Sequence, residues 1–226
     1  LVGSEMCIRD RRTTQRGSLT FYASRAEFDA AVDVALQTCE DFDDGLLNDG
    51  DLTGFAAPLS SSMGNAVFPA GSIVEGINIF DDPLNDAGGG GVNGLVGIGA
   101  TAFGTPSDIV GSNTFSDLMI LEFADGVDSL ALDAFSFISN GTVTVSYFDA
   151  GDAALGSTMV AADTVTSGFA GVSSPVPIAR VVLESLDVGS MPQAEAIDNV
   201  CFVASGPALP APQSVPALST QGLALI

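Results

Sequence analysis

The sequence predicts an all-β fold, a two-sheet antiparallel β-sandwich of the jelly-roll kind with one short N-terminal helix. Three observations support this prediction. Glycine and proline are frequent, at 26 and 11 of 226 residues, as expected of a turn-rich β protein. Short apolar segments follow one another at roughly ten-residue spacing, with turn residues between them. Hydrophobic residues make up 46% of the chain, which is enough for a sizeable core.

One helix is predicted near the start, over Ser24–Leu36. Ser24 is a typical N-cap residue, and Glu27 three positions later completes a capping box. The apolar residues of this segment fall on one stripe at helical spacing, at Phe28, Ala31, Val32 and Ala35. A short helix that precedes a sheet is expected to close one end of the core.

The strands are predicted from short apolar or alternating runs. In segment 142–148, valine and tyrosine alternate with threonine and serine, so one face of this strand should be buried. The Asn140-Gly141 pair before it favours a tight hairpin turn, because both central residues need positive φ. The other predicted strands cover 72–80, 94–100, 117–123, 129–138, 157–165, 168–174, 178–186 and 196–204.

The charge is strongly unbalanced. The chain has 28 acidic and 6 basic residues, a net charge of −22, with no lysine and no histidine. Such a chain repels nucleic acid and anionic membrane surfaces, which leaves cations, neutral sugars or other neutral surfaces as partners. The acidity equally suits a protein that stays soluble in salty surroundings. Without histidine, Ser-His-Asp triads, Cys-His pairs and histidine metal sites are excluded.

The first residues differ from the rest. "LVGSEMCIRDRR" resembles the translated adapter sequence found at the ends of metagenomic fragments, and it lacks the apolar run of a secretory signal. Residues 1–16 are therefore interpreted as an artefact or a disordered leader, which removes Cys7 from the cysteine count. A β-sandwich domain is predicted for 17–204, followed by a Pro/Ala linker over 205–214.

The last segment, "VPALSTQGLALI" at 215–226, resembles the start of the bacterial IPTL-CTERM sorting signal, a relative of PEP-CTERM. The matching residues include Val215, Pro216, Leu218, Ser219 and Gly222. Ala217 replaces the usual threonine, and Gln221 stands where a tryptophan normally precedes the glycine. The apolar end is far shorter than the roughly 20 residues that span a bilayer, so we expect the sequence to stop inside the anchor helix. The alternative is a frayed apolar terminus of a secreted protein. The resemblance implies a secreted or cell-envelope protein of a Gram-negative bacterium, sorted by an exosortase-like enzyme and meeting the membrane only through that missing helix.

The body also resembles the β-sandwich domains that carry such tails, through "RAEFDAAV…CEDFDDG" near its start and "PIARVVLES…AIDNVCF" near its end. Sandwiches that end on an "IDN" strand look like carbohydrate-binding modules, in which an early acid and one on the last strand share a structural calcium. The resemblance therefore implies a calcium site. In a strand, Asp41 and Asp43 would point to the same face and could meet Asp198 across paired strands. The competing interpretation is that these carboxylates are solvated turn residues.

Cys39 and Cys201 lie on the presumed first and last strands, which are often neighbours in a jelly roll. Since an exported protein meets oxidising conditions, a Cys39–Cys201 disulfide is predicted. It would close a loop of about 160 residues and stabilise the fold by roughly 4–5 kcal/mol in the chain-entropy model. The alternative is a pair of buried free thiols.

The leading functional hypothesis is an exported, non-enzymatic protein of the cell surface or biofilm matrix. A second hypothesis is a calcium-supported carbohydrate-binding module that recognises exopolysaccharide, and a third is a glycoside hydrolase-like enzyme. Among so many acids, pairs of carboxylates at hydrolase spacing are inevitable, so no catalytic residue is singled out. Arg180, within an apolar strand, is expected to form a structural ion pair with Glu184 or a neighbouring acid, and the alternative is a binding role.

Overall fold

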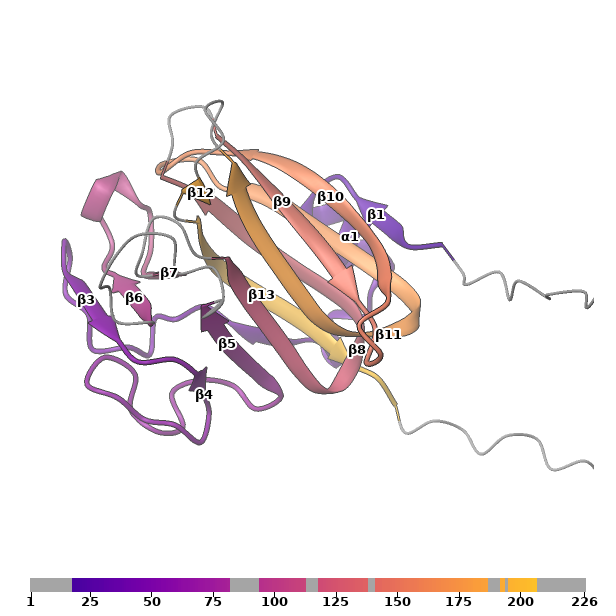
Figure 1. Cartoon of the computed structure of the whole chain (residues 1–226), viewed down its shortest axis with the longest axis horizontal. Coiled ribbons are helices and arrows are strands. Elements are labelled where there is room, and N and C mark those ends of the chain that lie inside the picture. Colours follow the sequence, from indigo (N-terminus) through magenta and orange to yellow (C-terminus); the bar gives the residue numbers. More distant parts are fainter. Residues whose placement is uncertain are drawn as a thin grey trace, which may run out of the picture.

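A computed structural model describes residues 18–81, 94–112, 118–137, 141–186, 192–193 and 195–206 (Figure 1). This part of the chain is all-β and antiparallel with one short α-helix, as the sequence predicts. Its helices are α1 (Arg25–Ala31) and the 3-10 helices η1 (Val34–Leu36) and η2 (Ala102–Gly104). Its strands are β1 (Thr20–Tyr22), β2 (Thr38–Glu40), β3 (Leu52–Phe55), β4 (Leu59–Ser60), β5 (Ile77–Asp81), β6 (Leu95–Ile98), β7 (Ile109–Ser112), β8 (Met119–Ser136), β9 (Gly141–Phe148), β10 (Ala154–Ala162), β11 (Gly168–Leu186), β12 (Pro192–Gln193) and β13 (Glu195–Ala204).

Two long strands, β8 and β11, run through both layers of the sandwich. The sequence predicts two strands in each of these regions, but the structure joins each pair into one strand. The first part of β8 pairs with β5 and its second part pairs with β13. The β8–β11 register breaks between Ser173 and Ile178. Gly126, at φ +71°, lies in the same region, where an added Cβ would meet Pro177 at 2.8 Å. This bend separates the two layers.

The first layer contains β10, β9, the C-terminal part of β11, the start of β8, β5 and β4. The second layer contains β1, the N-terminal part of β11, the rest of β8, β13, β7, β6 and β3, with β2 beside β13. Side chains from both layers pack in one core, and the rings of Phe123 and Phe202 meet across it at 5.3 Å. The alternation in β9 is confirmed, since Val143, Val145 and Tyr147 are buried.

The helix begins as predicted but ends earlier. The Ser24 side chain accepts a hydrogen bond from the backbone N–H of Glu27, and the Glu27 carboxylate accepts one from Ala23. The predicted extension to Leu36 is wrong, because Val32 adopts a β conformation and Asp33 caps the separate helix η1. Asp33 offers the backbone a competing hydrogen bond, and the β-branched valines on either side of it favour helix only weakly.

The position of α1 also differs from the prediction. Phe28 and Val32 are buried against Ala131 on the outer side of the second layer. The helix therefore covers a sheet face and does not close an end of the core. The aromatic ring of Phe28, packed edge-on against Tyr22 with centroids 5.5 Å apart, is the main apolar contact of the helix.

Several predicted features lie outside the described residues. They are the leader at 1–16, the Asn140 position of the hairpin turn, most of the Pro/Ala linker, and the sorting-signal residues Val215, Pro216, Leu218, Ser219 and Gly222. Among the helices that the structure describes, none has the length and apolar character needed to cross a membrane.

Candidate functional site

The outer surface of the first layer is the candidate site and is called the open face below. Its outward side chains alternate with the buried core residues of the same strands, and most are half-buried. The residues that define it are Asn78, Phe80, Ile120, Glu122, Thr144, Ser146, Phe148, Arg180, Val182 and Glu184. The described helices α1 and η2 pack elsewhere, against the outer side of the second layer.

Strand register arranges these side chains in rows that cross the sheet. Glu122 lies directly opposite Asn78 on β5 and Arg180 on β11, and Arg180 lies opposite Phe148 on β9. Since neighbouring strands are about 4.8 Å apart, the polar part of this row, from Asn78 to Arg180, extends over roughly 10 Å and is called the polar row below. The next row is mostly apolar and contains Phe80, Ile120, Val182 and Ser146. The open face therefore presents hydrogen-bonding groups beside an apolar band.

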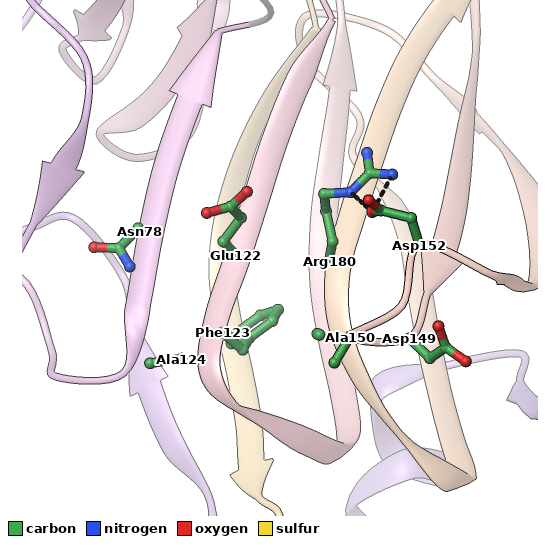
Figure 2. Close-up of a pocket in the computed structure, with 9 residues that line it drawn as sticks. Asn78, Glu122, Phe123, Ala124, Asp149, Ala150, Asp152 and Arg180 are labelled. Carbon is green, nitrogen blue, oxygen red and sulfur yellow. Dashed lines mark hydrogen bonds and ion pairs between the residues drawn. The ribbon is translucent and has the colours of Figure 1, made fainter.

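A pocket of about 360 Å³ lies over the polar row (Figure 2). Its hydrogen-bonding groups come from three strands and from the β9–β10 turn, namely Asn78, Glu122, Asp149, Asp152 and Arg180. In Figure 2 the side chains of Asn78, Glu122 and Arg180 lie side by side on adjacent strands. The pocket is thus shallow, polar and built on a rigid sheet.

Arg180 is held in a fixed orientation. Its guanidinium lies 4.3 Å from the centroid of the Phe148 ring and makes an ion pair with Asp152, at 3.0 Å between Nη2 and Oδ1. Asp152 belongs to a turn in which the Asp149 carboxylate accepts hydrogen bonds from Gly151 and Ala153. The predicted structural ion pair of Arg180 therefore exists, with Asp152 as the acid and not Glu184.

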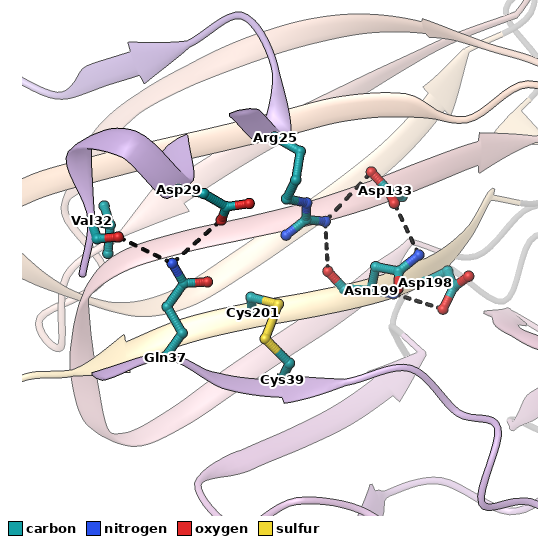
Figure 3. Close-up of a disulfide and its surroundings, with 9 residues drawn as sticks. All are labelled: Arg25, Asp29, Val32, Gln37, Cys39, Asp133, Asp198, Asn199 and Cys201. Carbon is teal, nitrogen blue, oxygen red and sulfur yellow. Dashed lines mark hydrogen bonds and ion pairs between the residues drawn. A yellow bond between two sulfur atoms is a disulfide. The ribbon is translucent and has the colours of Figure 1, made fainter. Parts of the chain in front are cut away.

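The opposite outer surface, on the second layer, is called the covered face and is built around Arg25, Asp133, Asn199 and the cysteine pair (Figure 3). Arg25 donates a hydrogen bond to the backbone carbonyl of Asn199 at 2.8 Å and lies 3.5 Å from the Asp133 carboxylate. The Asn199 side chain also donates to Asp133, at 3.0 Å. Asn199, at φ +50°, occupies a bulge where β13 changes register against β8. These contacts tie the start of α1 to the last strand.

The predicted disulfide is confirmed. Cys39 of β2 and Cys201 of β13 are direct cross-strand neighbours, with Cα atoms 4.0 Å apart and a sulfur–sulfur bond between them. The pairing of these two strands, one near each end of the domain, is also as predicted. The bond lies on the covered face, beside the Arg25 contacts (Figure 3).

The predicted calcium ligands are only partly brought together. Asp41 and Asp43 are not in a strand, because β2 ends at Glu40 and a turn follows, with Phe42 at φ +59°. The prediction that a strand aligns their carboxylates is therefore wrong. The pKa of Asp198 is raised to about 6, mainly by burial and also by the nearby charges of Asp133 and Asp43, so Asp43 and Asp198 are electrostatic neighbours.

No group of three or more acidic or cysteine side chains in the described ranges is arranged to hold a metal ion. Calcium can also take backbone oxygens, so the calcium site stays a prediction. A fall in melting temperature on chelation would support it, and an unchanged melting temperature would count against it.

Four carboxyl groups with raised pKa values lie away from the pocket, at Glu40, Asp43, Glu195 and Asp198. Burial is the main cause at each of them. Glu40 accepts backbone hydrogen bonds from Phe42 and Val74, and Glu195 accepts them from Met119 and Ser185. The carboxylates of Glu40 and Glu195 therefore link separate segments of the backbone, and neither lies on the open face.

Sequence reasoning missed the polar row and the role of Arg25. The charged residues Glu122 and Arg180 within the apolar runs 117–123 and 178–186 were visible, but not which strands would be neighbours. For Arg25, the available indication in the sequence was the rarity of basic residues, since Arg25 and Arg180 are the two basic residues after position 16.

No protein-family model and no curated protein matches the sequence. Among solved structures, the chain is similar to a mutant of CBM29-2, a family 29 carbohydrate-binding module, complexed with mannohexaose. The TM-score is 0.39 with 10% identity, over 66% of this chain and 92% of that one. It is also similar to the family 11 carbohydrate-binding module of the cellulase Lic26A-Cel5E of Clostridium thermocellum. There the TM-score is 0.29 with 11% identity, over 75% of this chain and 95% of that one. Values this low carry no functional argument, so the function is argued from the residues of the open face.

Proposed function

We propose that this protein is a non-catalytic carbohydrate-binding β-sandwich that binds a polysaccharide on its open face. The observation that carries the proposal is the polar row of Asn78, Glu122 and Arg180, which lines a pocket and lies beside the apolar band of Phe80, Ile120 and Val182. A sugar ring has hydroxyl groups around its rim and apolar C–H groups on its faces. The open face offers both complementary surfaces side by side.

The chemistry of the polar row suits pairs of hydroxyl groups. Asn78 both donates and accepts hydrogen bonds, Glu122 accepts them, and the Arg180 guanidinium donates them in a planar fork. Because Asp152 and Phe148 already fix the orientation of Arg180, little side-chain entropy is lost when a ligand binds. The row spans roughly 10 Å, more than a single sugar ring, which favours a chain over a single monosaccharide.

A binding role is favoured over hydrolysis. Glycoside hydrolysis requires a carboxylic acid with a raised pKa next to a second carboxylate at the bond to be cleaved. The carboxyl groups of Glu40, Asp43, Glu195 and Asp198, whose pKa values are raised, lie on other parts of the molecule. None of these four groups can therefore act as the acid of a hydrolase in the pocket, and we favour binding.

Export is part of the proposal. A disulfide that links two terminal strands is typical of proteins from oxidising compartments. The hypothesis of a cell-surface or matrix protein sorted by an exosortase-like enzyme agrees with this, and binding to exopolysaccharide would hold such a protein in the matrix. Its test is the complete reading frame, which should encode a signal peptide before Thr13 and an apolar helix after Ile226.

Affinity measurements with defined oligosaccharides test the binding function. We expect binding by the wild type and at least a tenfold loss for Arg180→Ala. Arg25→Ala is the matched control, because it removes the other body arginine from the covered face and should leave the affinity unchanged. If no glycan binds, or if both variants bind equally well, the open face is not a carbohydrate site.

A further inference from the structure

The charges of the pocket limit which polysaccharide it can accept. Three carboxylates line it, from Glu122, Asp149 and Asp152, together with a single cation, Arg180. Asp152 neutralises that cation through the 3.0 Å ion pair. The pocket therefore keeps the formal negative charge of Glu122, on a chain with a net charge of −22. Uronic acid, sulfated and phosphorylated polymers are repelled by this field.

Glu122 occupies the central position of the row. It is exposed, and it lies between Asn78 and Arg180 in direct cross-strand register. Figure 2 shows the Arg180 guanidinium turned toward Asp152 and away from Glu122. The Glu122 carboxylate thus faces the pocket as an acceptor, with the Asn78 amide beside it as a second polar contact. A ligand cation at this position would be attracted by the charge of Glu122 and would donate a hydrogen bond to its carboxylate.

The apolar row beside the pocket favours a cation that is carried on a sugar chain. The neighbouring row is apolar at Phe80, Ile120 and Val182, and it suits the C–H faces of successive rings. A simple amine would leave this band exposed, whereas a polymer of aminosugars would cover it. The pocket and the band together fit a ligand that is extended, rich in hydroxyl groups and positively charged.

Resting on the proposed carbohydrate-binding function, we propose that the open face selects polysaccharides that carry free amino groups, such as partly or fully de-N-acetylated hexosamine polymers. Glu122 is the residue that contacts the ammonium group. Asn78 and Arg180 bind hydroxyl groups on either side of it. The acidity of the whole chain attracts the same ligand over longer distances and makes binding sensitive to salt.

The test uses hexamers that differ only in N-acetylation. The wild type is titrated calorimetrically at pH 6 with a glucosamine hexamer, its fully N-acetylated form and a neutral glucan hexamer. An amine with the pKa of an ordinary α-amino group is protonated at this pH. We expect the glucosamine hexamer to bind about tenfold more tightly than the other two, as one charge-assisted hydrogen bond would give. Raising the salt concentration should reduce that difference.

Two variants locate the effect. Glu122→Gln keeps the shape of the side chain and should bring the affinities for the three hexamers close together. Asp49→Asn removes one exposed carboxylate outside the pocket and should leave the tenfold preference intact. A circular dichroism melt of each variant shows that it is folded.

The outcomes separate the two proposals. Equal or tighter binding of the N-acetylated or neutral hexamer by the wild type overturns the selection for amines and leaves carbohydrate binding in place. A preference that survives Glu122→Gln, or binding of spermine as tight as that of the glucosamine hexamer, also overturns it. Absence of binding to every hexamer overturns both proposals.

Discussion

The two outer faces of the sandwich use similar residues for different purposes. Each contains one of the two arginines that follow position 16, and each arginine lies over a phenylalanine ring and pairs with an aspartate. On the covered face, Arg25 and Asp133 are both about a quarter exposed, and Arg25 also bonds to the backbone at Asn199. On the open face, the Asp152 partner of Arg180 is 77% exposed. Burial of the acidic partner, and not the ion pair itself, therefore decides whether an arginine stabilises the fold or can serve a ligand.

Removing the disulfide should give the largest loss of unfolding free energy. The change is confined to the covered face and should leave the open face intact. Cys39→Ala with Cys201→Ala opens a loop that spans 162 residues, which the chain-entropy model values at about 5 kcal/mol of unfolding free energy. Denaturant unfolding of the double variant and the wild type measures the loss. Glycan affinity under folding conditions should stay the same. A large loss of affinity in a fully folded double variant would contradict the independence of the two faces.

Arg25→Ala should follow, with a loss of about 2 kcal/mol, the usual value for a hydrogen bond to a charged group. The physical reason is that the backbone carbonyl of Asn199 and the Asp133 carboxylate both lose their cation. Denaturant unfolding measures this loss. Arg25→Lys serves as the control, because it keeps the charge but not the planar fork, and it should recover part of the stability.

The pH dependence of stability tests Glu195, a buried carboxyl group that lies between the two faces. Glu195 of β13, in the second layer, accepts hydrogen bonds from Met119 and Ser185 of the first layer, and burial raises its pKa well above the ordinary value. A raised pKa means that the folded state binds the proton more strongly than the unfolded state. The stability from this group is therefore complete below about pH 4.5 and is lost as the pH rises through the raised pKa.

The expected slope for one such proton is about 1.4 kcal/mol per pH unit. Unfolding measured between pH 4 and pH 8 should show stability that declines with pH, and Glu195→Gln should flatten the decline. Glu75→Gln, an exposed substitution, is the control and should keep the wild-type slope. A wild type that is equally stable across this range would contradict the prediction.

Arg180→Ala should have the smallest effect on stability and the largest on binding. An ion pair with so exposed a partner contributes less than about 1 kcal/mol, so the melting temperature should change little. Affinity for any glycan ligand should fall at least tenfold. A variant that unfolds readily would show that Arg180 has the same structural role as Arg25 and would remove the contrast between the faces.

Some features of this fold follow from local sequence. The alternation of Val143, Val145 and Tyr147 with polar residues specifies β9, because successive side chains of a strand point to opposite faces. Ser24 and Glu27 specify where the helix begins, because both act within a single turn. The disulfide was also predictable, since the position of each cysteine near an end of the domain can be read from the chain, and the resemblance to a sorting signal implied an oxidising context.

The site depended on the tertiary structure. Asn78, Glu122, Arg180 and Phe148 come from four strands spread between positions 78 and 180 of the chain, and only the register of β5, β8, β11 and β9 places them in one row. The end of α1 and the turn at Asp41 and Asp43 also depended on competition between local hydrogen bonds and packing. Periodicity along the chain thus determines which face of each strand is buried. Which strands become neighbours, and therefore which outward side chains meet, is decided by the bend of β8 and β11 and by long-range packing that no single segment encodes.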